Sequence, residues 1–203
     1  AEFTHGNADL TQALCDAVIA IALAEGRQIT VLHTSSTHAT ADSPYGRSKR
    51  AAEEALQRAS QHPLVRTHVF RLPNVFGKWC RPNYNSAVAT FCHNVARDLP
   101  IQVHDAQAPM TLVYIDDVLQ RFLQIMDGAD AMSGPDGFST VQPQYTTTVG
   151  DIAQQIQAFH RSRETLVTER VGTGLVRALY ATYVSYLPVE SFDESVITDG
   201  LAF

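Results

Sequence analysis

A tyrosine and a lysine four residues apart are the side chains of this sequence with the clearest potential for chemistry. Tyr45 and Lys49 lie in the segment 43–49 (SPYGRSK). A spacing of four places both side chains on one face of a helix, and Pro44 suits the first turn of such a helix. The pKa of a free tyrosine is about 10, and a nearby ammonium lowers it by favouring the phenolate. The pair could therefore exchange a proton near neutral pH.

Hydroxyl side chains precede this pair at the end of an apolar run. Ser35, Ser36 and Thr37 follow the predicted strand at residues 28–33. A hydroxyl at this position could hydrogen-bond a substrate carbonyl that Tyr45 protonates. Together these groups suit hydride transfer, with a phenol as acid, a lysine that tunes it and a hydroxyl that orients the carbonyl. The Tyr-Lys spacing alone is a weak signal, because a surface helix with a tyrosine at its start has the same pattern.

Alternating helices and strands must position these residues. Apolar periodicity and capping residues predict helices at 9–25, 47–59, 86–97, 116–126, 147–159 and 174–183, and strands at 28–33, 66–72, 101–103, 112–115 and 138–141. Such alternation indicates an α/β fold with parallel strands, in which ligands lie beyond the carboxyl ends of the strands. Ser35, Ser36 and Asn74 fall at such ends, with Tyr45 near them.

The helices also carry expectations about their faces and caps. Helix 9–25, capped by Asn7 or Asp9, is apolar nearly all round, which predicts burial on both sides. One expected face comprises Leu10, Leu14, Val18, Ile21 and Ala22. In helix 47–59 the alanines and Leu56 are expected to point inward and Glu53, Glu54 and Arg58 outward. Asn85 is expected to cap helix 86–97, whose free N–H groups suit a diphosphate.

Composition limits the classes of partner. The chain has 203 residues, 45% of them hydrophobic, which suits one domain or two small lobes with a real core. A net charge of −6 without a basic tract argues against nucleic acid. Three cysteines without metal spacing predict reduced thiols, no metal site and a cytoplasmic protein. No uninterrupted apolar run reaches about 18 residues, so we expect no membrane contact.

The block from the predicted strand 28–33 to Lys49 resembles the extended short-chain dehydrogenase/reductase family of nucleotide-sugar epimerases, dehydratases and reductases. The resemblance implies a partial Rossmann-like parallel sheet with helices on both faces, plus a small α/β substrate-binding lobe. Residues 1–77 would be the C-terminal half of the dinucleotide-binding domain and 78–190 the substrate-binding lobe. Segments at about 111–141 would return to the first domain, and 191–203 would form a tail. The family's glycine-rich dinucleotide turn is missing from the sequence.

Two stretches resemble, within this family, the reductases of capsular polysaccharide synthesis. These are residues 71–85 (RLPNVFGKWCRPNYN) and 179–188 (LYATYVSYLP). The resemblance implies NADPH-dependent reduction, with NAD as the alternative cofactor, of the 4-keto group of a UDP-linked deoxy-hexosamine in capsule or O-antigen synthesis. The chain would act as part of a longer one, with a cupin domain. The alternatives are an epimerase or dehydratase of the same family, or a non-catalytic fragment without the cofactor loop.

The resemblance also implies residue roles. Tyr45 would protonate the carbonyl, Lys49 would hold the nicotinamide ribose, and Ser36 would orient the carbonyl, with Thr37 as the alternative. The implied cofactor-binding residues are Ser35, Tyr45, Lys49, Leu72, Pro73, Asn74 and Val75. The implied substrate-binding residues are Thr37, Asn74, Asn83 and Asn85, the last two near the UDP diphosphate. Besides the UDP-sugar, the resemblance implies a homodimer built on helices 9–25 and 47–59.

Overall fold

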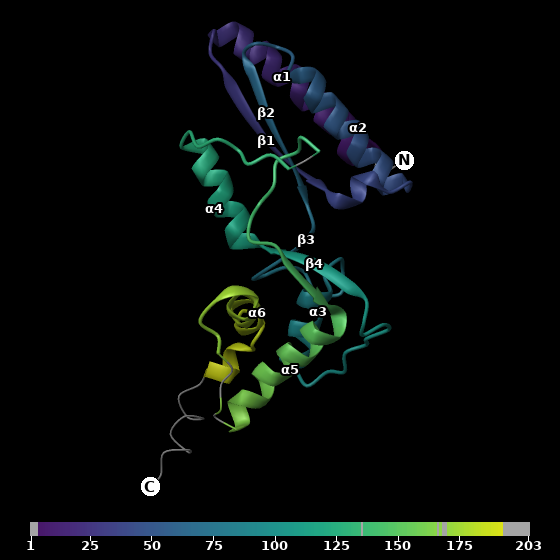
Figure 1. Cartoon of the computed structure of the whole chain (residues 1–203), viewed down its shortest axis with the longest axis vertical. Helices are drawn as coiled ribbons and strands as arrows, with labels where there is room; N and C mark the ends of the chain where they lie inside the picture. Colours follow the sequence, from purple (N-terminus) through teal and green to yellow (C-terminus); the bar gives the residue numbers. More distant parts are fainter. Residues whose placement is uncertain (1–3, 135, 166, 168–169, 193–203) are drawn as a thin grey trace. The chain divides into compact units, whose positions relative to one another are not determined.

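The computed structural model describes residues 4–134, 136–165, 167 and 170–192, and these residues form two compact units (Figure 1). Unit 1 comprises residues 1–73 and 117–143, and unit 2 comprises residues 74–116 and 144–203. Unit 1 contains η1 (Thr4–Asp9), α1 (Leu10–Glu25), β1 (Ile29–Ser36), η2 (Thr37–Thr40), α2 (Pro44–Ala59), β2 (Val65–Leu72) and most of α4 (Ile115–Met126). Unit 2 contains β3 (Asn74–Phe76), α3 (Ala87–Val95), β4 (Pro109–Tyr114), β5 (Tyr145–Thr148), α5 (Val149–Thr165), α6 (Gly174–Val184) and η3 (Val189–Phe192).

The sheet of unit 1 is parallel, as the alternation of helix and strand predicts. β1 pairs with β2 from Ile29↔Val65 to Ser36↔Leu72, so both strands end side by side. The backbone N–H of Ser139 donates to the carbonyl of Val69 at 2.8 Å and extends the pairing beyond β2. The helices α1 and α2 lie together over β1 and β2 in Figure 1. The α/β fold class with a parallel sheet is therefore confirmed.

The helix α1 buries a different face from the one that the sequence predicts. Its buried residues are Thr11, Cys15, Val18 and Ala22. Cys15, Val18 and Ala22 pack in one cluster with Ala55 and Ala59 of α2 and with β2. Leu10, Leu14, Ile21 and Leu23 are exposed instead. A helix that is apolar on all sides gives no periodic signal for the side that packs within its own unit, so only Val18 and Ala22 of the expected face are buried within the chain.

The start of α1 also differs from the prediction. Asp9 is itself helical and makes no side-chain cap, because η1 runs directly into the helix. Asn7, the other expected cap, donates from Nδ2 to Oγ of Ser48 on α2 at 3.1 Å. The segment before α1 is thereby fastened to the helix that carries Tyr45 and Lys49.

One side chain of α2 departs from the prediction in a way that matters for the site. Glu53 was expected to face outward, but it is 2% exposed. Its neighbour Glu54 is exposed as expected. The burial of Glu53 brings a carboxylate into the interior of unit 1, next to β1 and β2.

Unit 2 has its own sheet and core. β3 pairs in parallel with β4, and β4 pairs antiparallel with β5. The core gathers large side chains of α3, α5 and α6 around this sheet, including Phe91, Ile156 and Tyr183. Residues 101–103, which were expected to form a strand, form none. The helix predicted from residue 147 begins at Val149, and Thr148 accepts from the backbone N–H of Asp151 at 3.1 Å.

The cap of α3 was predicted at the wrong residue, because Asn85 and Ser86 are neighbours that can both cap a helix. Ser86, and not Asn85, caps α3, and its Oγ accepts from the backbone N–H of Ala89 at 3.2 Å. Asp116 and Asp117 lie within the first turn of α4, which begins at Ile115. Asp116 forms an ion pair with Lys78 at 2.9 Å.

Among the residues that the structure describes, one helical stretch is long and apolar enough to span a membrane. It runs from Gly6 to Glu25 and has a mean hydropathy of 1.3. Polar residues such as Asp16 interrupt this stretch, so the expectation based on uninterrupted apolar runs did not include it. A single such helix near an N-terminus is weak evidence for a membrane span, because packed helices of soluble proteins and signal sequences have the same length and hydropathy.

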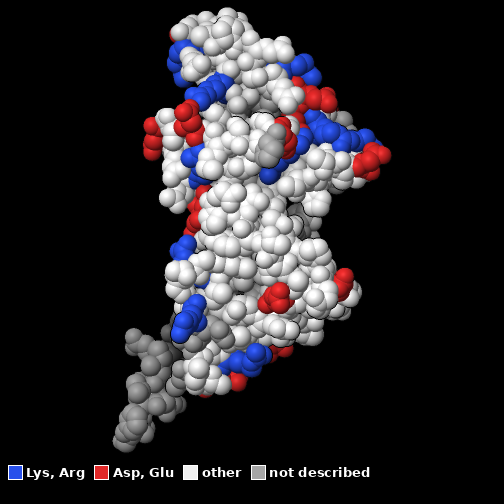
Figure 2. Space-filling model, in the orientation of Figure 1, with Lys and Arg blue, Asp and Glu red and all other residues white. Residues whose placement is uncertain are grey.

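On the face shown in Figure 2, basic and acidic side chains are interspersed and form no continuous basic patch.

Candidate functional site

The first turns of α2 place Tyr45 and Lys49 together. Ser43 caps the helix, with its Oγ accepting from the backbone N–H of Gly46 at 3.0 Å, and Pro44 occupies the first turn. The Lys49 ammonium lies over the Tyr45 ring, 5.8 Å from its centroid. Both side chains are half-buried. The predicted placement of the two side chains on one helix face is therefore confirmed.

The loop that follows β1 packs tightly against this helix start. A Cβ on Gly46 would lie 2.3 Å from the carbonyl oxygen of Ala41 and 2.7 Å from that of His38, so only glycine permits this approach. Arg50 donates from Nη1 to the carbonyl oxygens of Ala39 at 2.6 Å and Ala41 at 3.2 Å. The residues after Ser36 are thus held against the helix that carries Tyr45.

The two serines at the end of β1 have different surroundings. The Ser35 hydroxyl is buried and donates to Oε1 of Glu53 at 2.5 Å. Oγ of Ser36 accepts from the backbone N–H of His38 at 3.1 Å and caps η2. Successive residues of a strand point to opposite faces, which explains the difference. The Ser36 oxygen keeps acceptor capacity and a donor proton, whereas the Ser35 hydroxyl is engaged inside unit 1.

Burial and a neighbouring charge have opposite effects on the pKa of Lys49. Burial lowers the pKa of Lys49, and the Glu53 carboxylate counters this by favouring the ammonium. Burial likewise lowers the pKa of His33 on β1, and the charge of Lys49 lowers it further. His33 thus favours its neutral form beside the ammonium. Sequence reasoning identified Lys49 but missed His33 and Glu53, because neither has a spacing signature.

The remaining predicted cofactor contacts divide between the two units. Leu72 pairs with Ser36 at the end of β2 and is buried, and Pro73 is the next residue of unit 1. Asn74 and Val75 belong to β3 in unit 2. Nδ2 of Asn74 donates to the carbonyl of Thr111 at 3.3 Å. The roles of these four residues therefore stay predictions.

A cavity of about 470 Å³ in unit 2 contains the other predicted substrate residues. Asn83 and Asn85 both line it, next to the N-terminus of α3. Asn83 adopts a left-handed backbone conformation, and its N–H donates to Oγ1 of Thr90 at 2.9 Å. Sequence reasoning missed further polar residues of the lining, which include Thr90, Gln102, His104 and Asp105. Helix N–H groups and polar side chains around one concave surface suit an anionic, sugar-bearing ligand.

These residues fit a nicotinamide dinucleotide in part. A half-buried ammonium and a phenol on one helix face, beside the ends of two parallel strands, suit the nicotinamide ribose. Among the described residues, no glycine with positive φ follows a parallel strand and opens a helix, so these residues offer no dinucleotide diphosphate turn. The described residues also contain no cluster of side chains suited to a metal.

Comparison with known proteins identifies the family of the chain. Residues 2–139 match the NAD dependent epimerase/dehydratase family. The chain belongs to this family. The matched residues include β1, β2 and the helix α2, which carries Tyr45 and Lys49.

Two similar proteins extend the comparison. The chain is 53% identical over 197 residues to a UDP-2-acetamido-2,6-beta-L-arabino-hexul-4-ose reductase of Pseudomonas aeruginosa, covering 96% of this chain and 50% of the reductase. It matches the crystal structure of the capsular polysaccharide assembling protein CapF from Staphylococcus aureus at 35% identity with a TM-score of 0.80, covering 88% of this chain and 49% of CapF. The chain therefore spans about half the length of these relatives.

A third match supports the fold alone. The UDP-glucuronic acid 4-epimerase of Bacillus cereus, solved with UDP-glucuronic acid and NAD, matches with a TM-score of 0.67 at 16% identity. This match covers 89% of the chain and 67% of the epimerase. The epimerase/dehydratase fold thus extends through both units.

Proposed function

We propose that the chain is part of an NADPH-dependent reductase that acts on the 4-keto group of a UDP-linked deoxy-hexosamine. The observation that carries the proposal is the Tyr45–Lys49 pair at the start of α2, in a chain 53% identical to a UDP-4-keto-sugar reductase. The loop that follows Ser36 packs against the same helix start. Identity at this level over nearly the whole chain favours the reductase over an epimerase or dehydratase of the same family. A role in capsule or O-antigen sugar synthesis agrees with the similarity to CapF.

In this proposal the chain's own residues manage the carbonyl oxygen and its proton. NADPH, when bound, supplies the hydride that reaches C4 of the sugar. Tyr45 donates its phenolic proton to the carbonyl oxygen, so that the C=O bond becomes an alcohol. Ser36 donates a hydrogen bond to the same oxygen and orients it. Lys49, as an ammonium, holds the nicotinamide ribose.

The nucleotide part of the substrate would lie in the cavity of unit 2. Asn83 and Asn85 supply amide groups, and the N-terminus of α3 supplies the positive end of a helix dipole near a diphosphate. Trp79 and Tyr84 are both largely exposed. Tyr84 also lines the cavity and offers an aromatic face there.

The assembly belongs to the same proposal. The exposed apolar residues Leu10, Leu14, Ile21 and Leu23 of α1 suit a symmetric dimer. A cupin domain and a dinucleotide-binding half would complete the longer chain, and the protein would work in the cytoplasm.

The test is reduction of the UDP-4-keto sugar by the full-length protein, followed as oxidation of NADPH. Tyr45→Phe is expected to lower kcat about 10²–10⁴-fold while the cofactor still binds, because the general acid is lost. Tyr180→Phe in α6 removes the hydroxyl of another half-buried tyrosine, outside the site, and serves as the control. Turnover near that of the native protein in Tyr45→Phe would remove the catalytic assignment.

A further inference from the structure

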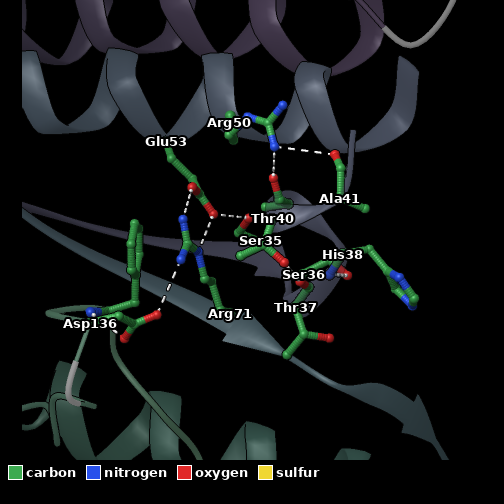
Figure 3. A network of polar contacts seen from close by, with 12 residues as sticks. Ser35, Ser36, Thr37, His38, Thr40, Ala41, Arg50, Glu53, Arg71 and Asp136 are labelled. Atoms are coloured by element: carbon green, nitrogen blue, oxygen red, sulfur yellow. Dashed lines mark hydrogen bonds and ion pairs between the residues drawn. The ribbon is translucent and has the colours of Figure 1, made fainter. Parts of the chain in front are cut away.

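Glu53 is a buried carboxylate that the proposed mechanism does not use. It follows Tyr45 and Lys49 at spacings of four on the same face of α2, and it is 2% exposed. Its Oε1 accepts from Oγ of Ser35 at 2.5 Å and from Nε of Arg71 at 3.0 Å, and its Oε2 accepts from Nη2 of Arg71 at 2.7 Å. Figure 3 shows Glu53 reaching from α2 to both strands.

Arg71 connects this carboxylate to further parts of unit 1. Its guanidinium lies over the Phe138 ring at 3.6 Å from the centroid, and its Nη1 pairs with Oδ2 of Asp136 at 3.2 Å. Ser35 and Arg71 are partners in the β1–β2 register. Glu53 therefore joins the ends of two neighbouring strands to the helix that carries Tyr45.

A second side chain of α2 fastens the same segment further along. Arg50 donates to the carbonyl oxygens of Ala39 and Ala41, while Glu53 receives the hydroxyl of Ser35 (Figure 3). Ser36 and Thr37 lie between these two attachment points. The hydroxyls proposed to meet the carbonyl are thus held at both ends by the helix that presents Tyr45 and Lys49.

Glu53 also influences the charge state of Lys49. Among the described residues, the titratable groups that face Lys49 are Tyr45 and Glu53 on its own helix and His33 on β1. Glu53 is the acidic one among them. Burial disfavours the Lys49 ammonium, and the Glu53 carboxylate favours it. The mechanism proposed above needs this ammonium.

We propose that Glu53 is a positioning residue for the carbonyl reduction. It fixes the strand end that carries Ser36 against the helix that carries Tyr45, and it keeps an acidic charge beside the Lys49 ammonium. This inference rests on the proposed function. Stability alone does not account for the arrangement, because a well-packed apolar pair can replace a buried ion pair without loss of stability.

Three single variants in the full-length protein test the inference. Glu53→Gln keeps the shape and removes the charge, Glu53→Asp keeps the charge, and Glu54→Gln makes the same charge change at an exposed position. Glu53→Gln is expected to lower kcat about 10- to 100-fold, the range for a lost protonation state or a displacement of about 1 Å, with little change in KM. Glu54→Gln is expected to behave like the native protein.

The pH dependence separates positioning from a general structural role. Activity needs charged Lys49, so it falls as the pH rises through the pKa of Lys49. Loss of the Glu53 charge lowers that pKa further, so the basic limb of the kcat profile should move to lower pH in Glu53→Gln. In Glu53→Asp, which keeps the negative charge, the basic limb should lie close to its native position. An unmoved limb in folded Glu53→Gln would overturn this part of the inference.

A readout without cofactor uses the 203-residue chain itself. The neutral amine of Lys49 reacts with an acylating reagent, and mass spectrometry gives its labelling against pH. The midpoint should fall in Glu53→Gln and stay native in Glu54→Gln. This measurement is independent of the proposed reaction, so it still decides the effect of Glu53 on Lys49 if no reduction is found.

A double variant covers the case in which Glu53→Gln does not fold. Glu53→Met with Arg71→Leu replaces both charges by apolar groups. It is expected to remain folded, although the buried Ser35 hydroxyl loses its acceptor, and to lose kcat. A folded double variant with native kcat and a native basic limb would overturn the inference. If Tyr45→Phe is inactive while all Glu53 variants are native, only the positioning role fails. If Tyr45→Phe is fully active, the proposed function itself fails.

Discussion

Gly46→Ala tests the close approach of the loop 37–41 to the start of α2. The new Cβ would lie 2.3 Å from the carbonyl oxygen of Ala41 and 2.7 Å from that of His38. Carbon–oxygen contacts are ordinarily about 3.3–3.6 Å, so the loop would have to retreat by roughly 1 Å. Both contacts are with backbone, which cannot rotate away as a flexible side chain can.

The expected magnitude combines two opposing effects. Overpacking of a buried position costs about 1–3 kcal/mol, whereas alanine gains up to about 1 kcal/mol over glycine inside a helix. The net expectation is a loss of roughly 1–2 kcal/mol in the free energy of unfolding. For a chain of this size that corresponds to a fall in Tm of about 2–8 °C. In the full-length protein, displacement of Ser36 by about 1 Å should also lower kcat by up to about 100-fold.

The assay is urea denaturation of the 203-residue chain, with Gly172→Ala as the matched control. A Cβ at Gly172 would meet no atom within 4 Å, and no positive φ stands against the substitution. Gly172→Ala should therefore leave the denaturation midpoint unchanged. Equal midpoints for Gly46→Ala and Gly172→Ala would refute the close approach, and with it the idea that Gly46 is required by the loop.

Two further predictions concern the cofactor and the assembly. The isolated 203-residue chain should bind NADPH with a Kd above the micromolar range, because its described residues offer no glycine turn for the diphosphate. Calorimetry measures this Kd. A micromolar Kd, which corresponds to a binding free energy of about −8 kcal/mol, would contradict the prediction. Sedimentation at tens of micromolar should show a dimer that Leu23→Glu dissociates, because Leu23 is 61% exposed on the apolar face of α1. A native monomer that Leu23→Glu does not alter would exclude this interface.

The sequence predicts the fold of unit 1 well because its signals are local. Alternating apolar segments, the Pro44 entry and Gly26 after α1 are all properties of a few adjacent residues. The parallel pairing of β1 with β2 then follows from the helix between them. The Tyr45–Lys49 geometry is also local, because it depends only on the helical repeat.

The buried face of α1 and the burial of Glu53 are not local properties. Glu53 is buried because Arg71, which lies on a different strand, supplies a bidentate partner, and helical periodicity alone assigns a glutamate to solvent. Ser86 and Asn85 can both cap a helix, and only the backbone conformation selects Ser86. The cavity residue His104 lies in a segment without regular structure, which has no periodic signature.

The Glu53–Arg71 ion pair restricts the order in which this chain can change during evolution. Removing one member of a buried pair leaves the other charge uncompensated, at a cost of about 3–5 kcal/mol. Domains of ordinary stability have only about 5–15 kcal/mol in total. Replacement of the pair by apolar residues therefore passes through a poorly folded intermediate sequence, unless another substitution stabilises the chain first. The ion pair can persist by historical constraint even where its charge adds nothing to stability.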